Sequence, residues 1–175
     1  MAADPAGGRR RGAGWIARLS DGSSRFFAAR GLYLGRRSTR FHVALYRLSR
    51  GRLGGRVPGW PQARIALVDH TGARSGRRRT APLMYVAEDD TVAVVASKAG
   101  EPRHPAWFHN LLAHPETTVQ IGAERRPVRA RVAAPGERER LWPRFVAAFP
   151  NYGFYAERAA PREIPLVLLE PRARP

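Results

Sequence analysis

The 175-residue chain carries 31 lysine and arginine residues against 14 aspartate and glutamate residues, a formal net charge of +17, and it contains no cysteine. This length suits one domain with a sizeable hydrophobic core, and the lack of cysteine excludes a disulfide framework, a thiolate metal site and a thiol nucleophile, which favours a cytoplasmic protein. No run of 18 apolar residues is present, so the sequence predicts no membrane-spanning helix.

The surplus positive charge lies in the N-terminal third, where residues 1–60 hold 13 arginines against Asp4 and Asp21. Residues 1–37 are rich in Gly, Ala, Arg and Ser, so we expect a basic, mobile N-terminal extension followed by one domain over 38–175. Such an arm attracts nucleic acid or an anionic membrane surface, or it serves only to solubilise the protein, and charge alone does not choose among these. Few aromatic residues stand among its arginines, so we expect no specific nucleic acid partner.

The first regular element is an amphipathic helix that starts near Ser38 and stops at Gly51. Its apolar residues Phe41, Ala44, Leu45 and Leu48 recur at helical spacing, and we expect arginines on its outer face. The Gly- and Pro-rich sequence that follows predicts a loop up to residue 62.

Short β patterns and turn residues dominate the rest of the chain. The pattern predicts six strands, at 63–69, 80–87, 91–97, 117–122, 128–133 and 164–170. Helices are predicted at 105–114 and 136–149, the second with a kink or a late start at Pro143. Because most strands are joined by hairpins, we predict an α+β, mainly β, antiparallel barrel-like fold.

Several common catalytic sites are not supported by the spacing of the residues. His104, His109 and His114 lie five apart, which places successive side chains about 140° apart on a helix, so no metal site is predicted. The sequence also lacks a Gly-x-Ser-x-Gly nucleophile elbow and a Gly-x-Gly-x-x-Gly dinucleotide motif.

The predicted hairpin tip over 71–80 is more informative. Its two glycines, Gly72 and Gly76, allow the backbone amides to turn toward a common point, and Arg74, Ser75 and Arg79 add donors that suit a phosphate. An ordinary solvated hairpin is the alternative.

A second group of residues follows the third predicted strand, in the sequence VVASKAGEPRHPAWFHN over 94–110. It holds Lys98, the only lysine of the chain, with Ser97 before it and Trp107 and Asn110 after it. If Ser97 and Lys98 leave the sheet near an edge beside the hairpin, a groove forms that suits a flat ring with an anionic tail.

The chain resembles the deazaflavin-dependent nitroreductase family, the quinone and nitroimidazole reductases that use coenzyme F420. The resemblance runs from Ser38 to Pro171 and rests on several motifs, among them GRLGG, HTGARSGRRRTAPLMYV, VVASKAGEPRHPAWFHNLLAHPETTVQIG, FPNYGFY and REIPLVLLEP. It implies a split β-barrel of the kind found in flavin-mononucleotide oxidases.

The resemblance also implies roles for individual residues. Arg74, Ser75 and Arg79, with Lys98 beside them, are expected to hold the phosphate and glutamate tail of F420. The residues expected around the deazaflavin ring are Pro82, Met84, Ala96, Ser97, Trp107 and Asn110. Tyr152 and Tyr155 are expected at the acceptor pocket, whereas Phe149 replaces a tyrosine that is common in the family.

The activity implied is hydride transfer from reduced F420 to a quinone, a nitroaromatic compound or an activated enone, with a proton from Ser97, Tyr152, Tyr155 or solvent. Two alternatives stay open: a flavin mononucleotide-dependent reductase on the same fold, and a non-enzymatic binding module for nucleic acid or an anionic membrane. The sequence leaves the oligomeric state open.

Overall fold

The computed structural model describes residues 36–172, so nearly all of the expected N-terminal extension lies outside the described part. The order of elements along the chain is α2 (Arg36–Leu48), β1 (Arg56–Val57), β2 (Trp60–Thr71), β3 (Arg78–Glu88), β4 (Thr91–Val95), the 3-10 turn η1 (Lys98–Gly100), α3 (Ala106–Ala113), β5 (Glu116–Ile121), β6 (Glu124–Val132), α4 (Pro135–Ala148), α5 (Asn151–Ala159) and β7 (Leu166–Pro171).

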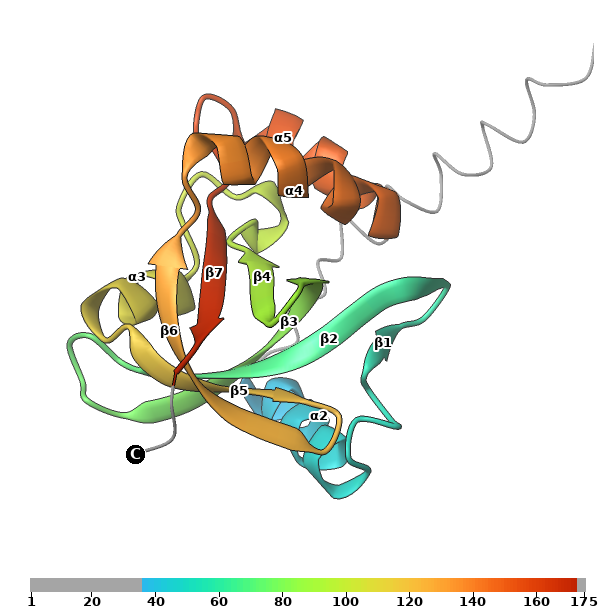
Figure 1. Cartoon of the computed structure of the whole chain (residues 1–175), viewed down its shortest axis with the longest axis vertical. Coiled ribbons are helices and arrows are strands. Elements are labelled where there is room, and N and C mark those ends of the chain that lie inside the picture. The colour runs from blue at the N-terminus through green and yellow to red at the C-terminus, as the bar shows by residue number, and fades with distance from the viewer. Residues whose placement is uncertain (1–35, 173–175) are drawn as a thin grey trace, which may run out of the picture. The chain divides into compact units, whose positions relative to one another are not determined.

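These strands form an antiparallel barrel, as predicted. The sheet order is β1-β2-β3-β4-β7-β6-β5, and β2 also pairs with β5 through Leu67 and Val68, which closes strands β2 to β7 on themselves. Side chains alternate between the two faces of β2, so Ala66 and Val68 fill the interior while Ile65 and Leu67 pack on the outside. Helix α2 lies beneath the barrel and α4 and α5 lie above it in Figure 1.

The predicted elements are confirmed with three differences. The predicted loop before residue 63 contains β1 and the start of β2, and α5 forms a separate helix that the sequence did not predict. The late start of the second predicted helix is wrong, because α4 begins at Pro135 and continues through Pro143. The pairings β2–β3, β3–β4 and β5–β6 match the predicted hairpins.

Helix α2 presents to the barrel the opposite face from the one that the apolar spacing indicates. Phe41 is 70% exposed and Leu48 is 86% exposed, whereas Tyr46 is buried. The Tyr46 hydroxyl donates a hydrogen bond to the carbonyl of Ile65 (3.0 Å) and accepts one from the amide of Gly122 (2.9 Å). These two bonds fix the helix on the outside of β2, and they leave an apolar stripe facing outward.

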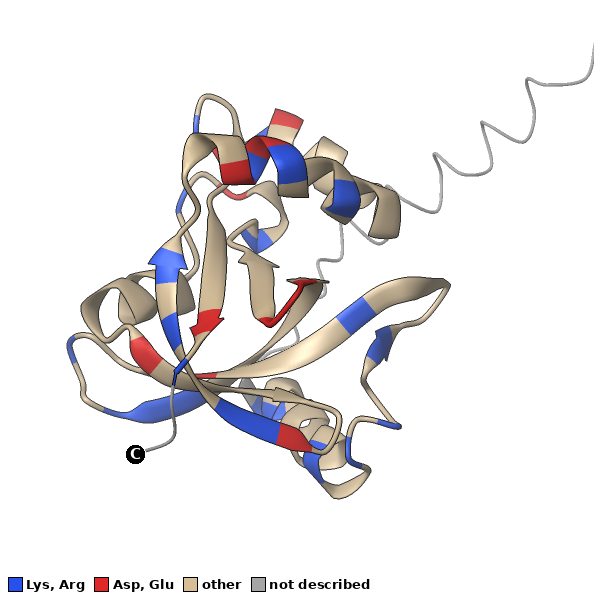
Figure 2. Cartoon of the chain, in the orientation of Figure 1, with Lys and Arg blue, Asp and Glu red and all other residues tan. Residues whose placement is uncertain are grey.

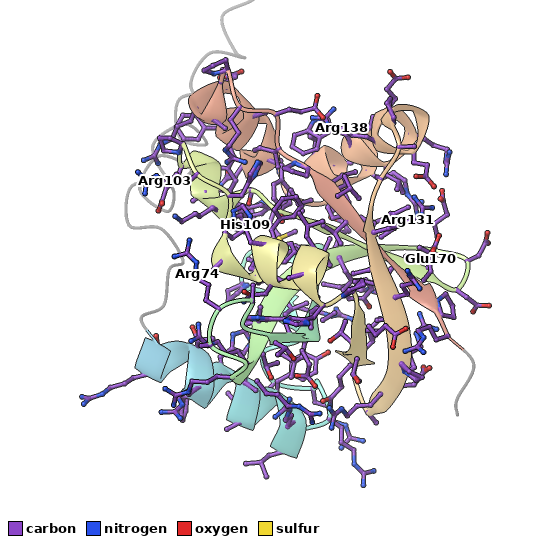
Figure 3. The ribbon with its side chains drawn as sticks, turned by 90° about the vertical axis from the view of Figure 1, so that its left-hand side faces the viewer. Arg74, Arg103, His109, Arg131, Arg138 and Glu170 are labelled. Atoms are coloured by element: carbon purple, nitrogen blue, oxygen red, sulfur yellow. The ribbon has the colours of Figure 1, made fainter. Side chains whose placement is uncertain are left out.

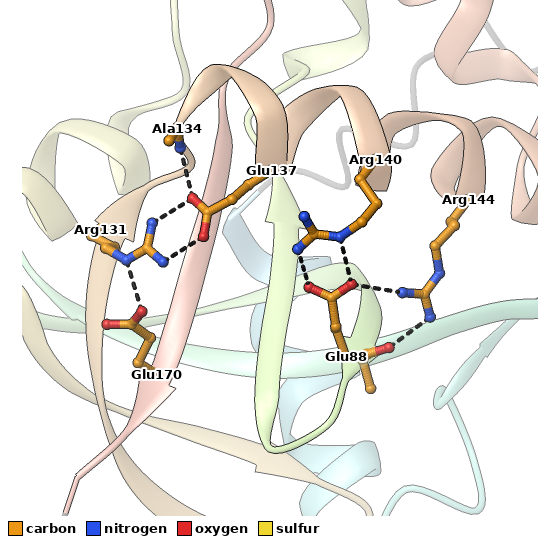
Figure 4. Close-up of polar contacts among 8 residues, drawn as sticks. Glu88, Arg131, Ala134, Glu137, Arg140, Arg144 and Glu170 are labelled. Carbon is orange, nitrogen blue, oxygen red and sulfur yellow. Dashed lines mark hydrogen bonds and ion pairs between the residues drawn. The ribbon is translucent and has the colours of Figure 1, made fainter.

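Ion pairs attach α4 to the barrel (Figure 4). Arg131 of β6 donates to Glu137 of α4 at 2.6 and 2.7 Å and to Glu170 of β7 at 2.7 Å. About one turn further along the helix, Arg140 donates to both carboxylate oxygens of Glu88, at 3.1 and 2.7 Å. Because Arg–carboxylate pairs of this kind are geometrically specific, they fix how α4 and the following α5 lie over the barrel.

Candidate functional site

An apolar patch covers the outer face of β2 and β3. Pro82 and Met84 are two residues apart on β3 and so lie on the same face, opposite Leu67 and Ile65 of β2. Met84 packs with the buried cluster that contains Ile65, and Phe149, which follows α4, packs there too. The structure therefore brings Pro82 and Met84 to one surface, and it places Phe149 beside that surface.

The hairpin loop between β2 and β3 spans residues 72–77, and the predicted tail-binding residues Arg74, Ser75 and Arg79 are exposed on or beside it. Figure 2 shows the basic residues of this loop and of the start of β3, and Figure 3 shows Arg74 projecting from the same side of the molecule as Arg103 and His109. No acidic residue in the described part of the chain pairs with Arg74 or Arg79.

The backbone of this loop does not form the predicted phosphate cradle. The amides of Ser75 and Gly76 both donate to the carbonyl of Gly72, at 3.2 and 2.8 Å, and the amide of Gly72 donates to Arg77. These donors are consumed by the turn itself, so the prediction of amides aimed at a common anion is wrong. Only the side chains of the loop are left as candidates for holding an anion.

Asn110 of α3 anchors the hairpin loop. It is 7% exposed, its Oδ1 accepts a hydrogen bond from the amide of Ala73 (2.9 Å), and its Nδ2 donates to Nδ1 of His70 (2.9 Å). Burial and the nearby Arg79 lower the pKa of His70, which keeps Nδ1 free to accept this bond. Asn110 was predicted to contact the cofactor, and its amide here positions the loop.

Ser97 and Lys98 follow β4, which pairs with β3 on one side and β7 on the other. The predicted position at a sheet edge is therefore wrong, and these residues lie at the end of an interior strand, after the buried Ala96. Lys98 Nζ lies 2.8 Å from Oε2 of Glu101 and is in a turn with positive φ at Lys98, Ala99 and Gly100. Trp107 of α3 is half-buried against the barrel interior.

Tyr152 and Tyr155 belong to an aromatic cluster on α5. The ring centroid of Phe149 lies 5.7 Å from that of Tyr152 and 6.4 Å from that of Tyr155. Both tyrosines are buried, and burial raises the pKa of each hydroxyl above its usual value. Phe149 also packs on the buried cluster that contains Ile65 and Leu67, so it links the outer face of β2 and β3 to the predicted acceptor pocket.

A contact between α5 and the Lys98 turn completes the chain of contacts. A Cβ added at Gly100 would lie 2.8 Å from the carbonyl oxygen of Tyr155, so the two backbones touch. The apolar face, the tyrosines and the Lys98 turn are therefore contiguous, while Asn110 ties the hairpin loop to α3. Sequence reasoning missed His70, Glu101 and Arg162, the last of which contacts the carbonyls around Lys98.

One cavity lies apart from the predicted site residues. A cavity of about 540 Å³ opens at the end of β2 and β3 far from the hairpin loop, lined by Arg52, Arg56, Arg64, Ile65 and Tyr85 among others, and no predicted site residue lines it.

Among the described residues, no group of histidine and acidic side chains is arranged to hold a metal ion. Within residues 36–172 no helix is both long and apolar enough to cross a bilayer.

The residues present fit a ring with an anionic tail. The tail would meet unpaired arginines on the hairpin loop and the ammonium of Lys98, and the ring would meet half-buried apolar residues of β3. The side chain of Asn151, buried at the start of α5, lies close enough to the hydroxyl of Tyr155 to oppose the rise in its pKa, which places an amide beside the predicted acceptor pocket.

Comparison with known proteins shows which sequences and structures the chain is similar to. The family model described as F420H(2)-dependent quinone reductase matches residues 38–171. The putative F420H(2)-dependent quinone reductase Rv3178 of Mycobacterium tuberculosis is 43% identical over 106 residues, which cover 61% of this chain and 88% of the relative. The F420H(2)-dependent quinone reductase Rv1261c of the same organism is 38% identical over 143 residues, 80% of this chain and 94% of the relative.

A solved structure of an F420-H2 dependent reductase (FDR-A) is also similar. It has a TM-score of 0.56 and 42% sequence identity, over 61% of this chain and 93% of that chain.

Proposed function

Because the chain belongs to the F420H(2)-dependent quinone reductase family, we propose that it transfers a hydride from reduced coenzyme F420 to a quinone. The observation that carries the proposal is the apolar outer face of β3, which lies beside buried tyrosines while unpaired basic side chains extend from the same hairpin. A planar donor and a planar acceptor stack on such a face, and an anionic tail extends from it toward the arginines.

Two sets of residues would hold the cofactor. Arg74, Ser75, Arg79 and Lys98 bind the phosphate and the glutamate tail. The residues assigned to the ring are Pro82, Met84, Ala96, Ser97, Trp107 and Asn110, the last through the loop that it positions. Bound F420 supplies a hydride donor whose ring has carbon in place of the flavin N5, which disfavours one-electron steps.

The chain itself contributes orientation, exclusion of water and hydrogen-bond donation. Orientation matters most, because hydride transfer requires the acceptor within about 3–3.5 Å of the donor atom. Burial raises the pKa of Tyr152 and Tyr155, so both hydroxyls stay protonated at neutral pH and donate hydrogen bonds to a quinone oxygen. The same raised pKa disfavours release of the phenolic proton, so the proton that completes the reduction comes from solvent or through the Ser97 hydroxyl.

The acceptor range includes nitroaromatic compounds and activated enones in this proposal. Phe149 supports it in one respect, because its ring packs against the tyrosines and offers an apolar wall to any flat acceptor. The hydroxyl that the family commonly has at this position is missing, so Phe149→Tyr should change the relative rates for quinones and nitroaromatics more than it changes cofactor affinity.

The test is turnover with purified full-length protein. Oxidation of reduced F420 should require a naphthoquinone acceptor, and NADH, NADPH or reduced flavin mononucleotide should not replace the donor. Turnover with reduced flavin mononucleotide alone would support the flavin alternative, and binding of F420 without reduction of any acceptor would refute the catalytic assignment.

Peripheral contact with an anionic membrane is a further part of the proposal. The outward stripe of α2 carries Phe41 and Leu48 with exposed Arg37 and Arg40 on the same helix. Apolar side chains next to unpaired arginines suit an interface with anionic lipid, each engaged arginine contributing about 1 kcal/mol. This surface would work together with the basic residues that precede it.

Vesicle binding tests this part separately. Phe41→Ser with Leu48→Ser should weaken binding to vesicles that contain phosphatidylglycerol, whereas Leu112→Ser, which changes a leucine on α3 that is also exposed, should not. Deleting residues 1–35 should reduce binding in a salt-dependent way and leave F420 affinity unchanged. Equal binding by all four proteins would show that the membrane is not a partner.

A further inference from the structure

Arg162, in the segment between α5 and β7, contacts the backbone around the Lys98 turn more extensively than any side chain of the turn does. Its guanidinium donates to the carbonyls of Ser97 (2.9 Å), Glu101 (3.0 and 2.8 Å) and Ala96 (3.4 Å). It also donates to Nδ1 of His104 at 3.0 Å. One side chain therefore connects both ends of the turn.

The turn needs such a connection, because its backbone conformation is unfavourable. Lys98 and Ala99 have φ of 49° and 52°, and Gly100 has φ of 75°. A non-glycine residue in this region is destabilised by steric strain and persists only when its surroundings fix it. Within the turn, two backbone hydrogen bonds oppose that cost, from Gly100 to Ser97 (3.0 Å) and from Glu101 to Lys98 (3.1 Å), together with the partly exposed ion pair of Lys98 with Glu101 (2.8 Å).

The positive charge of Arg162 has no opposite charge beside it. No acidic residue in the described part of the chain pairs with this side chain, and its partners are backbone carbonyls and the Nδ1 atom of His104. Three carbonyls and His104 Nδ1 satisfy the five guanidinium donors without cancelling the positive charge. Arg162 thus adds to the attraction that the Lys98 turn exerts on an anion.

We propose that Arg162 is a positioning residue that holds the Lys98 turn in its left-handed conformation, so that the ammonium of Lys98 faces the anionic tail of the cofactor. The inference depends on the proposed function for the identity of the anion, while the clamp itself depends only on the contacts above. A lysine at position 162 would keep the charge but would not span carbonyls at both ends of the turn, because an ammonium lacks the planar fork.

The experiment compares Arg162→Met and Arg162→Lys with Arg129→Met, which removes an exposed arginine of β6 that belongs to a different part of the barrel from the turn. Affinity for oxidised F420 and for its ring fragment without phosphate and glutamates is measured by fluorescence titration. Arg162→Met should weaken binding of F420 about tenfold or more and Arg162→Lys about threefold or more, with the ring fragment changed less than about twofold. Arg129→Met should match the wild type.

Two further readouts separate positioning from a general loss of structure. Hydrogen exchange at the amides of Gly100 and Glu101 should accelerate in both Arg162 variants, while exchange in the barrel strands stays as in the wild type. Lys98→Ala combined with Arg162→Met should weaken F420 binding no more than the worse single variant, because both remove the same contact.

The inference is overturned if both Arg162 variants bind F420 as the wild type does, if full cofactor and fragment are weakened equally, or if the double variant shows additive losses. Wild-type protein that does not bind F420 would instead refute the proposed function. In that case the exchange measurement still decides whether Arg162 holds the turn.

Discussion

Replacing Glu101 with glutamine should tighten the binding of F420. Lys98 Nζ lies 2.8 Å from Oε2 of Glu101, and the two side chains are 24% and 42% exposed. An anionic tail that binds Lys98 has to displace this carboxylate and then lie close to it. Glutamine removes the competing charge but leaves the backbone carbonyl of residue 101, to which Arg162 donates, in place.

The magnitude follows from the partial exposure of the pair. Exposed ion pairs of this kind contribute about 0.2–1 kcal/mol, and relief of repulsion between Glu101 and the tail adds a similar amount. Together the two effects amount to about 0.4–2 kcal/mol, so Glu101→Gln should strengthen binding about two- to thirtyfold. Lys98→Ala removes a hydrogen bond to a charged group, about 1.5–3 kcal/mol or ten- to a hundredfold. The loss should be larger when Glu101 is already glutamine, because Lys98 then has no carboxylate to leave before it binds the tail.

Fluorescence titration of the wild type, both single variants and the double variant with F420, and with the ring fragment, measures these effects. The changes should be confined to the full cofactor and should shrink at high salt. Unchanged or weaker F420 binding by Glu101→Gln would refute competition for Lys98. Unchanged binding by Lys98→Ala would make Lys98 an ordinary surface residue, and an equal loss for the fragment would place it at the ring.

Three further predictions concern stability and loop order. Arg131 lowers the pKa of Glu137 to about 2, so the unfolded chain binds this proton first as pH falls, and the free energy of unfolding should decrease from about pH 4.5 toward pH 2; denaturant titrations should show a smaller decrease in Arg131→Met. Gly100→Ala should cost about 1–3 kcal/mol in thermal unfolding because its φ is 75° and α5 backbone lies against it, whereas Gly136→Ala, in an open helical position, should not destabilise. Asn110→Ala should accelerate hydrogen exchange in the hairpin loop and weaken F420 binding about tenfold, and slow exchange in this variant would contradict the anchoring role.

The barrel was predictable because each of its strands carries its own local pattern. Alternating or continuous apolar runs bounded by turn residues mark β2 to β7, and the register of β2 with β3 follows from the hairpin that joins them. Closure of the barrel pairs β2 with β5, which lie far apart in the sequence, so no local pattern predicts this pairing. Only the number of strands and their hairpin connections indicated a barrel. Helix α5 was missed because only Phe149 and Pro150 separate it from α4, and because Gly153 lies within it.

The orientation of α2 shows why periodicity alone is insufficient. Phe41, Ala44 and Leu48 form the more apolar stripe, yet His42 and Tyr46 face the barrel. His42 donates from Nε2 to the carbonyl of Gly54 at 2.8 Å, and Tyr46 bonds to two separate backbone groups. A buried hydroxyl with both hydrogen-bonding roles satisfied specifies one face, and those partners lie in segments that a helical pattern does not contain.

The residues of the site also differ in how well the sequence predicts them. Side chains proposed to act through their own charge or apolar surface, such as Arg74 and Met84, are visible in the sequence because residue type carries the chemistry. Arg162 acts on carbonyls, which every residue has, so no spacing of side chains marks it. The proposed roles also account for lysine at position 98: arginine there would bind Glu101 with a planar fork in a fixed geometry, whereas an ammonium on a flexible stem would move from Glu101 to an incoming anion by rotation alone. In this proposal Arg162 holds the backbone of the turn, and Lys98 binds the tail of the cofactor.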